Sequence, residues 1–202
     1  MSEQTRDLLK EVYSCDFIKI VEGPPRGIYR IIFSYPNSSL INSLIKTKII
    51  QGGTSSSDYK VLQFKANSVK TLKQFQADNK SRIGSSELPV SIVAQMTATL
   101  ATQLSYIIKT EKRTLIGYNS ENVIVINDKK FAFLGSELVT EIEDNMSQIS
   151  YPFSKTDFFV SPELLKIKTL PSMVHYKTAY FSLACLILGV LLLDDDYYNE
   201  YI

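Results

Sequence analysis

Residues 115–135 read LIGYNSENVIVINDKKFAFLG, and this stretch says most about the fold. Its second half holds two short runs of β-branched and aromatic residues, 122–126 (NVIVI) and 130–134 (KFAFL). The connection between them, 127–129 (NDK), consists largely of residues that favour turns. Because two such runs with a short connection are typical of antiparallel strand pairs, we predict a β-hairpin at 122–134.

A long helix is expected before this stretch. From Leu88 and Pro89 onward, apolar residues recur every three or four positions, which is the period of an α-helix packed on one side. The residues on this predicted buried side are Val93, Met96, Leu100, Leu104 and Ile107 or Ile108.

The N-terminal part of the chain favours β structure. Residues 16–22 (DFIKIVE) alternate between polar and apolar, and residues 28–35 (IYRIIFSY) are β-branched and aromatic. The turn-forming sequence PPRG at 24–27 lies between them, which predicts a first hairpin. Further along we expect a short helix capped by Ser39, a Gly/Ser loop at 51–58, a strand at 59–65 and a short basic helix through Val69, Leu72 and Phe75.

An apolar segment lies near the C-terminus. Residues 179–193 (AYFSLACLILGVLLL) are 15 residues without a charge, whereas a membrane-spanning helix needs about 20. We therefore predict a helix at about 177–193 that is buried on all sides in the protein core, and no membrane association. The polar N-terminal residues 1–14 do not look like a secretory signal, which predicts a cytoplasmic protein.

Composition excludes several functional classes. The chain has 202 residues, 45% of them hydrophobic, and a formal net charge of +1, so no strong overall field favours a nucleic acid or membrane partner. His175 is the single histidine, which excludes multi-histidine zinc sites. Cys15 and Cys185 lie far apart in unlike contexts, as expected of reduced thiols. We expect no metal and no cofactor.

The order of these elements resembles the protein-kinase family over about residues 50–193. The kinase motif H-R-D-x-K-x-x-N corresponds here to 115–122 (LIGYNSEN), and D-F-G corresponds to 133–135 (FLG). Residues 161–163 (SPE) look like the family's A-P-E, and 181–184 (FSLA) look like its W-S-L-G at the start of a buried helix.

The resemblance implies an α+β class and a two-lobed, kinase-like fold. A small β-rich N-lobe is expected at 1–87 and a mainly helical C-lobe at 88–202. Because the chain ends at Ile202, soon after the apolar helix, we expect the C-lobe to lack the last helices of a kinase.

The same register implies that the catalytic groups are lost. Asn122 matches the metal-binding asparagine of the family, but Gly117, Asn119 and Phe133 stand where the base aspartate, the catalytic-loop lysine and the metal-holding aspartate are expected. Phosphoryl transfer depends on those carboxylates, one to hold Mg²⁺ and one to accept the substrate proton. The resemblance therefore implies a catalytically inactive kinase-like protein, or pseudokinase.

A nucleotide site would be vestigial at best. Gly52 and Gly53 are only faintly like a phosphate-covering glycine loop, and Gln63 stands at the position of the phosphate-pairing lysine, with Lys65 two residues further on. Together with Asn122 these are the candidate nucleotide-binding residues. Four other matches are structural: Gly135 of the D-F-G position, and Ser161, Pro162 and Glu163.

The stretch 152–183 (PFSKTDFFVSPELLKIKTLPSMVHYKTAYFSL), taken with the abundance of Ile, Lys, Asn and Ser, resembles divergent kinase-like proteins of large cytoplasmic DNA viruses. This resemblance implies a viral structural or regulatory component in the host cytoplasm or the virion.

Residues 60–82 form the most basic stretch, with six cations and Asp78 as the one acid. Clustered cations bind phosphates by releasing counterions, so this stretch is a candidate surface for nucleic acid or an acidic protein. Its members are Lys60, Lys65, Lys70, Lys73, Lys80 and Arg82.

Three functions remain open. The leading one is an inactive kinase-like protein that binds another protein as a scaffold or regulator. The second is an atypical ATP-binding phosphotransferase or nucleotide-binding regulator that uses Lys65, Asn122 and acidic residues of 137–144. The third is a nucleic-acid-binding module centred on 60–82. Neither the partner nor the oligomeric state follows from the sequence.

Overall fold

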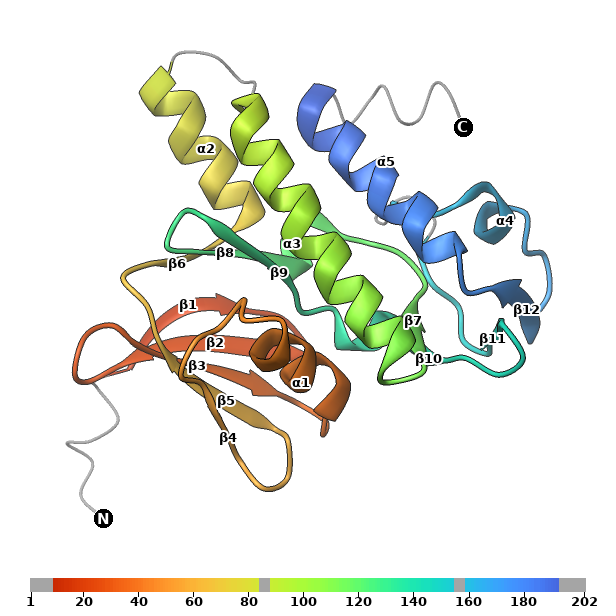
Figure 1. Ribbon diagram of the computed structural model, residues 1–202, viewed down its shortest axis with the longest axis horizontal. Helices are drawn as coiled ribbons and strands as arrows, with labels where there is room; N and C mark the ends of the chain where they lie inside the picture. Colours follow the sequence, from red (N-terminus) through yellow and green to blue (C-terminus); the bar gives the residue numbers. More distant parts are fainter. Residues whose placement is uncertain (1–8, 84–87, 155–158, 193–202) are drawn as a thin grey trace.

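The computed structural model describes residues 9–83, 88–154 and 159–192 and shows a mixed α+β protein, as expected, with β structure first and the longer helices later (Figure 1). An antiparallel five-stranded sheet has the strand order β1-β2-β3-β5-β4. Its strands are β1 (Lys10–Ser14), β2 (Ile18–Gly23), β3 (Ile28–Phe33), β4 (Thr54–Ser55) and β5 (Val61–Lys65).

The first predicted hairpin is confirmed. β2 and β3 pair from Ile18 opposite Phe33 to Gly23 opposite Ile28. The turn between them ends at Gly27, which has φ +83° and donates its backbone N–H to Glu22 Oε1 (3.0 Å). A glycine is needed at this position because a side chain rarely adopts a positive φ.

Helix α1 (Ser38–Lys46) connects the sheet to the helical part of the molecule. Its Leu40, Ile41 and Leu44 are fully buried in the core. The N-cap is Asn37, whose side chain accepts a hydrogen bond from Leu40 N (3.1 Å). The prediction of Ser39 as the cap was therefore wrong, because the asparagine two residues earlier makes that bond.

The short basic helix begins later than expected. Val69 belongs to strand β6 (Val69–Thr71), where it pairs with Ile126, and helix α2 (Leu72–Ile83) starts after it. Thr71 N donates to Gln74 Oε1 (3.0 Å), and Gln74 N donates to Thr71 Oγ1 (3.2 Å). This reciprocal capping starts the helix after Thr71, so Val69 is not helical.

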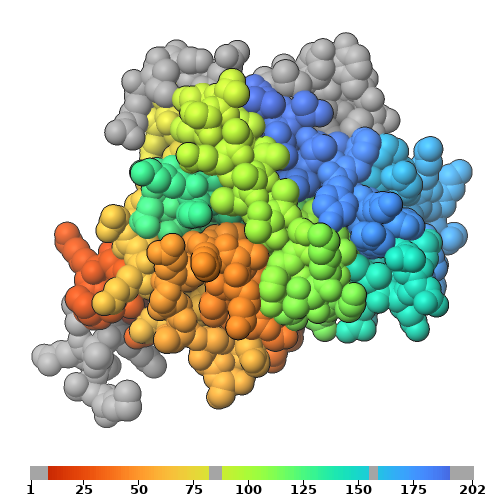
Figure 2. Space-filling model, viewed as in Figure 1, coloured from red at the N-terminus to blue at the C-terminus, as the bar shows by residue number. Residues whose placement is uncertain are grey.

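The long helix and the second hairpin are both confirmed. Helix α3 (Val90–Lys109) buries the predicted side, including Leu100 and Leu104. Strands β8 (Val123–Ile126) and β9 (Lys130–Phe133) pair with each other, and β6 joins them in the order β6-β8-β9. In Figure 2, α3 forms a continuous band between the β-rich part and the C-terminal helix.

The remaining elements come before and after this hairpin in the sequence and lie on one side of the molecule (Figure 1). β7 pairs with β10, and β11 pairs with β12. The bounds are β7 (Arg113–Leu115), two 3-10 helices at Ser120–Asn122 and Ser136–Leu138, β10 (Val139–Glu141), β11 (Met146–Ile149), α4 (Pro162–Leu165), β12 (Ser172–His175) and α5 (Thr178–Leu192).

The expectation that the apolar helix is buried on all sides was wrong. One side of α5 is buried, but Tyr180, Phe181 and Leu188 are 39%, 47% and 54% exposed. α3 packs on α5, and within the described chain the opposite side lacks cover. We call this surface the outer side of α5; it consists of Tyr180, Phe181, Ala184 and Leu188. No helix in the described ranges is long and apolar enough to cross a membrane.

Candidate functional site

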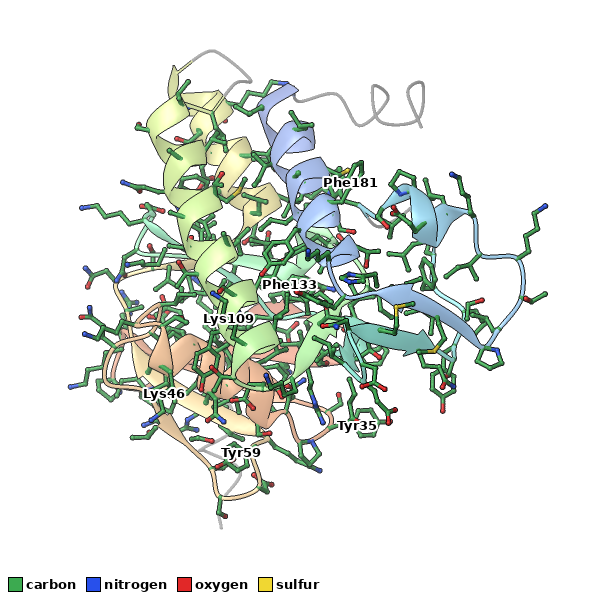
Figure 3. The ribbon with its side chains drawn as sticks, turned by 45° about the vertical axis from the view of Figure 1, so that its right-hand side comes forward. Tyr35, Lys46, Tyr59, Lys109, Phe133 and Phe181 are labelled. Atoms are coloured by element: carbon green, nitrogen blue, oxygen red, sulfur yellow. The ribbon has the colours of Figure 1, made fainter. Side chains whose placement is uncertain are left out.

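The candidate site lies around the stretch 115–135. Five residues from α3, the 120–122 turn, the end of β9 and the segment after it meet there: Gln103, Asn122, Phe133, Gly135 and Glu137. We call them the central cluster. Figure 3 shows Phe133 in the interior of the molecule, and its side chain is 1% exposed.

Asn122 is held in place by its own turn. Asn119 accepts the N–H of Glu121 with its side chain (2.8 Å) and the N–H of Asn122 with its backbone oxygen (3.0 Å). Leu134 N donates to the carbonyl of Asn122 (2.8 Å). With its backbone bonded on both sides, Asn122 directs its side-chain amide at Glu137, and Nδ2 donates to Oε1 over 2.6 Å.

Glu137 is the carboxylate of the central cluster. Its Oε1 accepts from Asn122, while Oε2 is buried and has no hydrogen-bond partner among the described residues. Burial raises the pKa of Glu137 above its usual value, and the hydrogen bond from Asn122 only partly opposes this effect. The 137–144 acids do not gather around it: Glu141 pairs with Arg113 (3.1 Å).

Gln103 was not predicted as a site residue. It is 1% exposed, and its side chain bonds to both backbone groups of Phe133. Phe133 N donates to Oε1 (2.8 Å), and Nε2 donates to Phe133 O (2.9 Å) and Ser43 Oγ (3.1 Å). The sequence held a signal, because Gln103 lies beside Leu104 on the side of the helix whose other positions are apolar.

Gly135 is required by close packing. A Cβ built there would collide with the Phe133 ring and lie 2.9 Å from Asn122 Nδ2. The Phe133 ring also meets the buried Tyr118 ring edge-on, with centroids 4.9 Å apart. The position where the kinase resemblance expects a metal-holding aspartate is thus filled by an aromatic ring in the core.

The central cluster has few groups for chemistry. Gly117 is buried and has no side chain, and Asn119 is used as a cap. Glu137 is therefore the one ionisable member of the cluster. In the part of the chain that the structure describes, no three His, Cys, Asp or Glu side chains gather in a way that suits a metal ion.

Strand β1 lies close to this region. Burial raises the pKa of Tyr13 far above its usual value, and its hydrogen bond with Cys15 and the charges of Glu121 and Glu137 add to this shift. The phenol of Tyr13 therefore lies within electrostatic range of Glu121 and Glu137. Cys15 and Cys185 are both free thiols.

The structure does not bring the candidate nucleotide-binding residues together. Gly52 is exposed at φ +64°, in the turn between α1 and β4. Gln63 accepts from Arg30 Nε (2.9 Å) on an exposed part of the sheet. Lys65 lies beside Ile126, whereas Asn122 lies at the opposite end of β8, about 13 Å away along the strand.

Gly53 has a packing role. An added Cβ would lie 2.9 Å from the Ile50 side chain and 3.2 Å from that of Leu62, so the turn leaves room for a glycine alone. Neither this residue nor Gly52 covers a cavity formed with Asn122.

A polar cavity of about 890 Å³ lies elsewhere, between β1, the segment after β5, and α2. Among the predicted residues, Lys70 lines it. The cavity also has both charge signs on its wall, from residues that include Lys10, Glu11, Glu22, Arg26 and Asp78.

The basic stretch is partly neutralised by acidic neighbours. Lys70 contacts Asp78 (2.7 Å) and Asp128 (3.6 Å), and Lys73 contacts Glu121 (2.9 Å). The hydrogen bond with Asp78 is the main cause that raises the pKa of Lys70. The other members are spread out: Lys60 and Lys65 flank β5 at opposite ends, Lys80 is exposed on α2, and the side chain of Arg82 lies outside the described residues.

Residues 161–163 begin a short helix. Ser161 is buried before α4, and Pro162 occupies its first turn, where proline is favoured. Glu163 is exposed. Leu164 belongs to a small apolar cluster with Ile149, Val160 and Val174.

Comparison with known proteins adds no family assignment to these geometric findings. The chain matches no protein-family model and no curated protein sequence.

Proposed function

We propose that this chain is an inactive kinase-like protein that acts by binding another protein. The observation that carries the proposal is the outer side of α5. It exposes Tyr180, Phe181 and Leu188 along one helix, and contiguous apolar surface of this kind is typical of interaction sites.

The kinase-like part of the proposal is supported by the order of elements. A β-rich part with one helix between β3 and β4 is followed by two helices, a β-hairpin, a short helix at 162–165 and an apolar helix. This is the order that the motif resemblance implies.

The inactive part is supported by the central cluster. Phe133 and Gly117 are both buried where the resemblance places the two essential aspartates. Glu137 cannot replace them both, because a single carboxylate cannot hold the metal and also accept the substrate proton.

The partner we propose is a helix with an apolar side and basic residues near one end. Phe181, Ala184 and Leu188 are spaced by three and four positions, which suits helix against helix packing, and the small Ala184 allows close approach. Asp194, Asp195 and Asp196 follow α5 directly in the sequence and favour a basic partner.

A binding comparison tests this function. The double variant Phe181→Asp and Leu188→Asp is compared with wild type and with a control, Val90→Asp and Tyr35→Asp, whose residues are also exposed (78% and 71%) but lie elsewhere. We expect a specific protein, captured from infected or native cell extract by wild type and control, to be lost with the α5 variant. That protein is then expressed alone. We expect its helix, which has an apolar side and basic residues near one end, to bind this chain directly.

Three results would contradict the proposal. Equal capture by all three proteins would show that α5 is not the docking surface. Self-association of wild type that the α5 variant abolishes, measured by analytical ultracentrifugation, would assign the surface to a second copy instead. A phosphotransfer assay with Mg²⁺ and ATP completes the test; transfer abolished by Asn122→Ala would disprove inactivity.

The second candidate function is a nucleotide-binding regulator. The observation in its favour is the polar cavity of about 890 Å³, because cavities of this size accommodate small ligands. Ligand bound only to the folded chain raises its melting temperature, so titration with ATP tests this alternative. No shift at millimolar ATP would exclude this alternative.

A further inference from the structure

Three segments that are distant in the sequence form a small recess with a strongly basic wall. It has a volume of about 240 Å³ and lies between the turn after α1, the end of β5 and the β8–β9 turn. Ten residues line it, and four of them are lysines: Lys48, Lys65, Lys129 and Lys130. We call this site the lysine recess.

The charge of the lysine recess is not balanced by acids. Its lining contains no aspartate or glutamate, and none of the four lysines forms an ion pair with a carboxylate in the described ranges. Asp128 lies in the same turn as Lys129, but its carboxylate faces Lys70 at 3.6 Å. The basic wall therefore contrasts with the chain as a whole, which has a net charge of +1.

The backbone around the recess is held by hydrogen bonds. Asn127 Oδ1 accepts the N–H groups of Asn67 (2.7 Å) and Ser68 (3.3 Å), which ties the β8–β9 turn to the segment after Lys65. On the opposite wall Lys48 adopts φ 58°, and Ile50 N donates to Leu44 O (3.0 Å). The lysines thus extend from fixed turns and not from free loops.

We propose that the lysine recess binds a compact polyphosphate group. Four lysines line one hollow, so their positive charges add there, and an anion with several adjacent charges is attracted to it. The recess is smaller than most sites for drug-sized ligands, so it suits a di- or triphosphate moiety better than a whole organic ligand.

The shape favours a small anion over a nucleic acid strand. A strand needs a charged track with stacking platforms, whereas these lysines surround one hollow. The linear basic stretch does not extend such a track, since Lys70 and Lys73 contact acids. The lysine recess is also independent of the proposed docking function, because it lies at the β-rich part of the chain and not on α5.

Calorimetric titration of the full chain with tripolyphosphate tests the proposal. The exposed lysines of the β8–β9 turn are neutralised in the double variant Lys129→Gln and Lys130→Gln, and the control is Lys166→Gln and Lys168→Gln, which changes the net charge equally at exposed sites elsewhere. We expect wild type and control to bind alike and the recess variant to bind at least ten-fold more weakly. Lys129→Arg with Lys130→Arg is expected to retain binding.

Three outcomes of these titrations would contradict the proposal. Equal weakening by the control would show a response to net charge only, and absence of tripolyphosphate binding at low salt would exclude the site. Binding of a single-stranded 12-nucleotide DNA more tightly than tripolyphosphate, with the same dependence on Lys129 and Lys130, would assign the surface to nucleic acid. ATP and inorganic pyrophosphate as further probes identify the source of the phosphates.

Discussion

The central cluster and the outer side of α5 are built on opposite principles. In the cluster, Gln103 satisfies both backbone groups of Phe133, and Asn122 bonds to Glu137, so polar side chains are fixed inside the core. On the outer side of α5, Phe181 and Leu188 are exposed to solvent, and the residue of that side between them is the small apolar Ala184. The first arrangement stabilises the core of this chain, and the second leaves an apolar surface exposed.

This difference separates residues that are explained by packing in the core from residues that are exposed on α5. Residues that match catalytic positions by sequence, such as Phe133 and Gly135, are now explained by packing. Residues that packing does not explain lie on α5. Variants in the two regions are therefore expected to act on different quantities, stability in the cluster and association on α5.

The largest loss of stability is expected for Gln103→Leu. The change leaves the N–H and C=O of Phe133 buried without partners, and each such group costs about 1–3 kcal/mol. We expect the free energy of unfolding to fall by about 2–4 kcal/mol in urea denaturation. Gln95→Leu on the exposed side of α3 is the matched control, expected to stay within about 0.5 kcal/mol. Equal effects would mean that the buried hydrogen bonds do not hold the cluster together.

Gly135→Ala is expected to cost somewhat less. The new methyl group would overlap the Phe133 ring, and overpacking of this kind costs about 1–3 kcal/mol. Combining it with Phe133→Leu makes room for the methyl group. The double variant should therefore lose less free energy of unfolding than the two single variants together. Full additivity in the double-mutant cycle would show that the ring is not what requires glycine.

Glu137→Gln is expected to reveal a pH dependence. Because burial raises the pKa of Glu137 in the folded chain, the folded state binds this proton more tightly than the unfolded state. Wild type should therefore gain stability relative to Glu137→Gln as pH is lowered from 7 through the raised pKa toward the ordinary value. Denaturation of both proteins at pH 7, 6 and 5 measures the free energy of unfolding of wild type minus that of Glu137→Gln. A value that stays constant or falls as pH is lowered would contradict a raised pKa.

The smallest effect on stability is expected on α5. Leu188 is 54% exposed, so Leu188→Gln should change the free energy of unfolding by no more than about 0.5 kcal/mol. Its effect should instead appear as weaker partner binding in the capture experiment. A loss of 2 kcal/mol or more would mean that this side chain is part of the core, and the comparison between the two regions would fail.

Local patterns predicted the elements that depend on neighbours in sequence. The period of apolar residues located α3, and the runs at 122–126 and 130–134 located β8 and β9. The start of α2 was missed, because Val69 continues the helical period and yet pairs with Ile126 of a strand more than 50 residues later. Long-range pairing of this kind overrides local periodicity.

Site residues were predicted less completely than elements. Asn122, Phe133 and Gly135 were identified because they share one motif, and the structure places them together. Glu137 was named with Asn122 only as one of the acidic residues of 137–144. Gln103 reaches the same place from α3, and a motif search along the chain does not connect it with Asn122. The lysine recess was missed for the same reason, since Lys48 and Lys129 are 81 positions apart.

The sequence by itself determined the mixed α+β class of the fold, because strand and helix periods are local in the sequence. Only the tertiary structure decided which apolar and charged side chains remain exposed on the surface. The 15 uncharged residues of the C-terminal helix look the same in sequence whether they are enclosed or half exposed, and packing by α3 on one side settled this. In the same way, ion pairs neutralise Lys70 and Lys73 of the basic stretch, while folding brings Lys65 of that stretch into one recess with three lysines from elsewhere in the sequence.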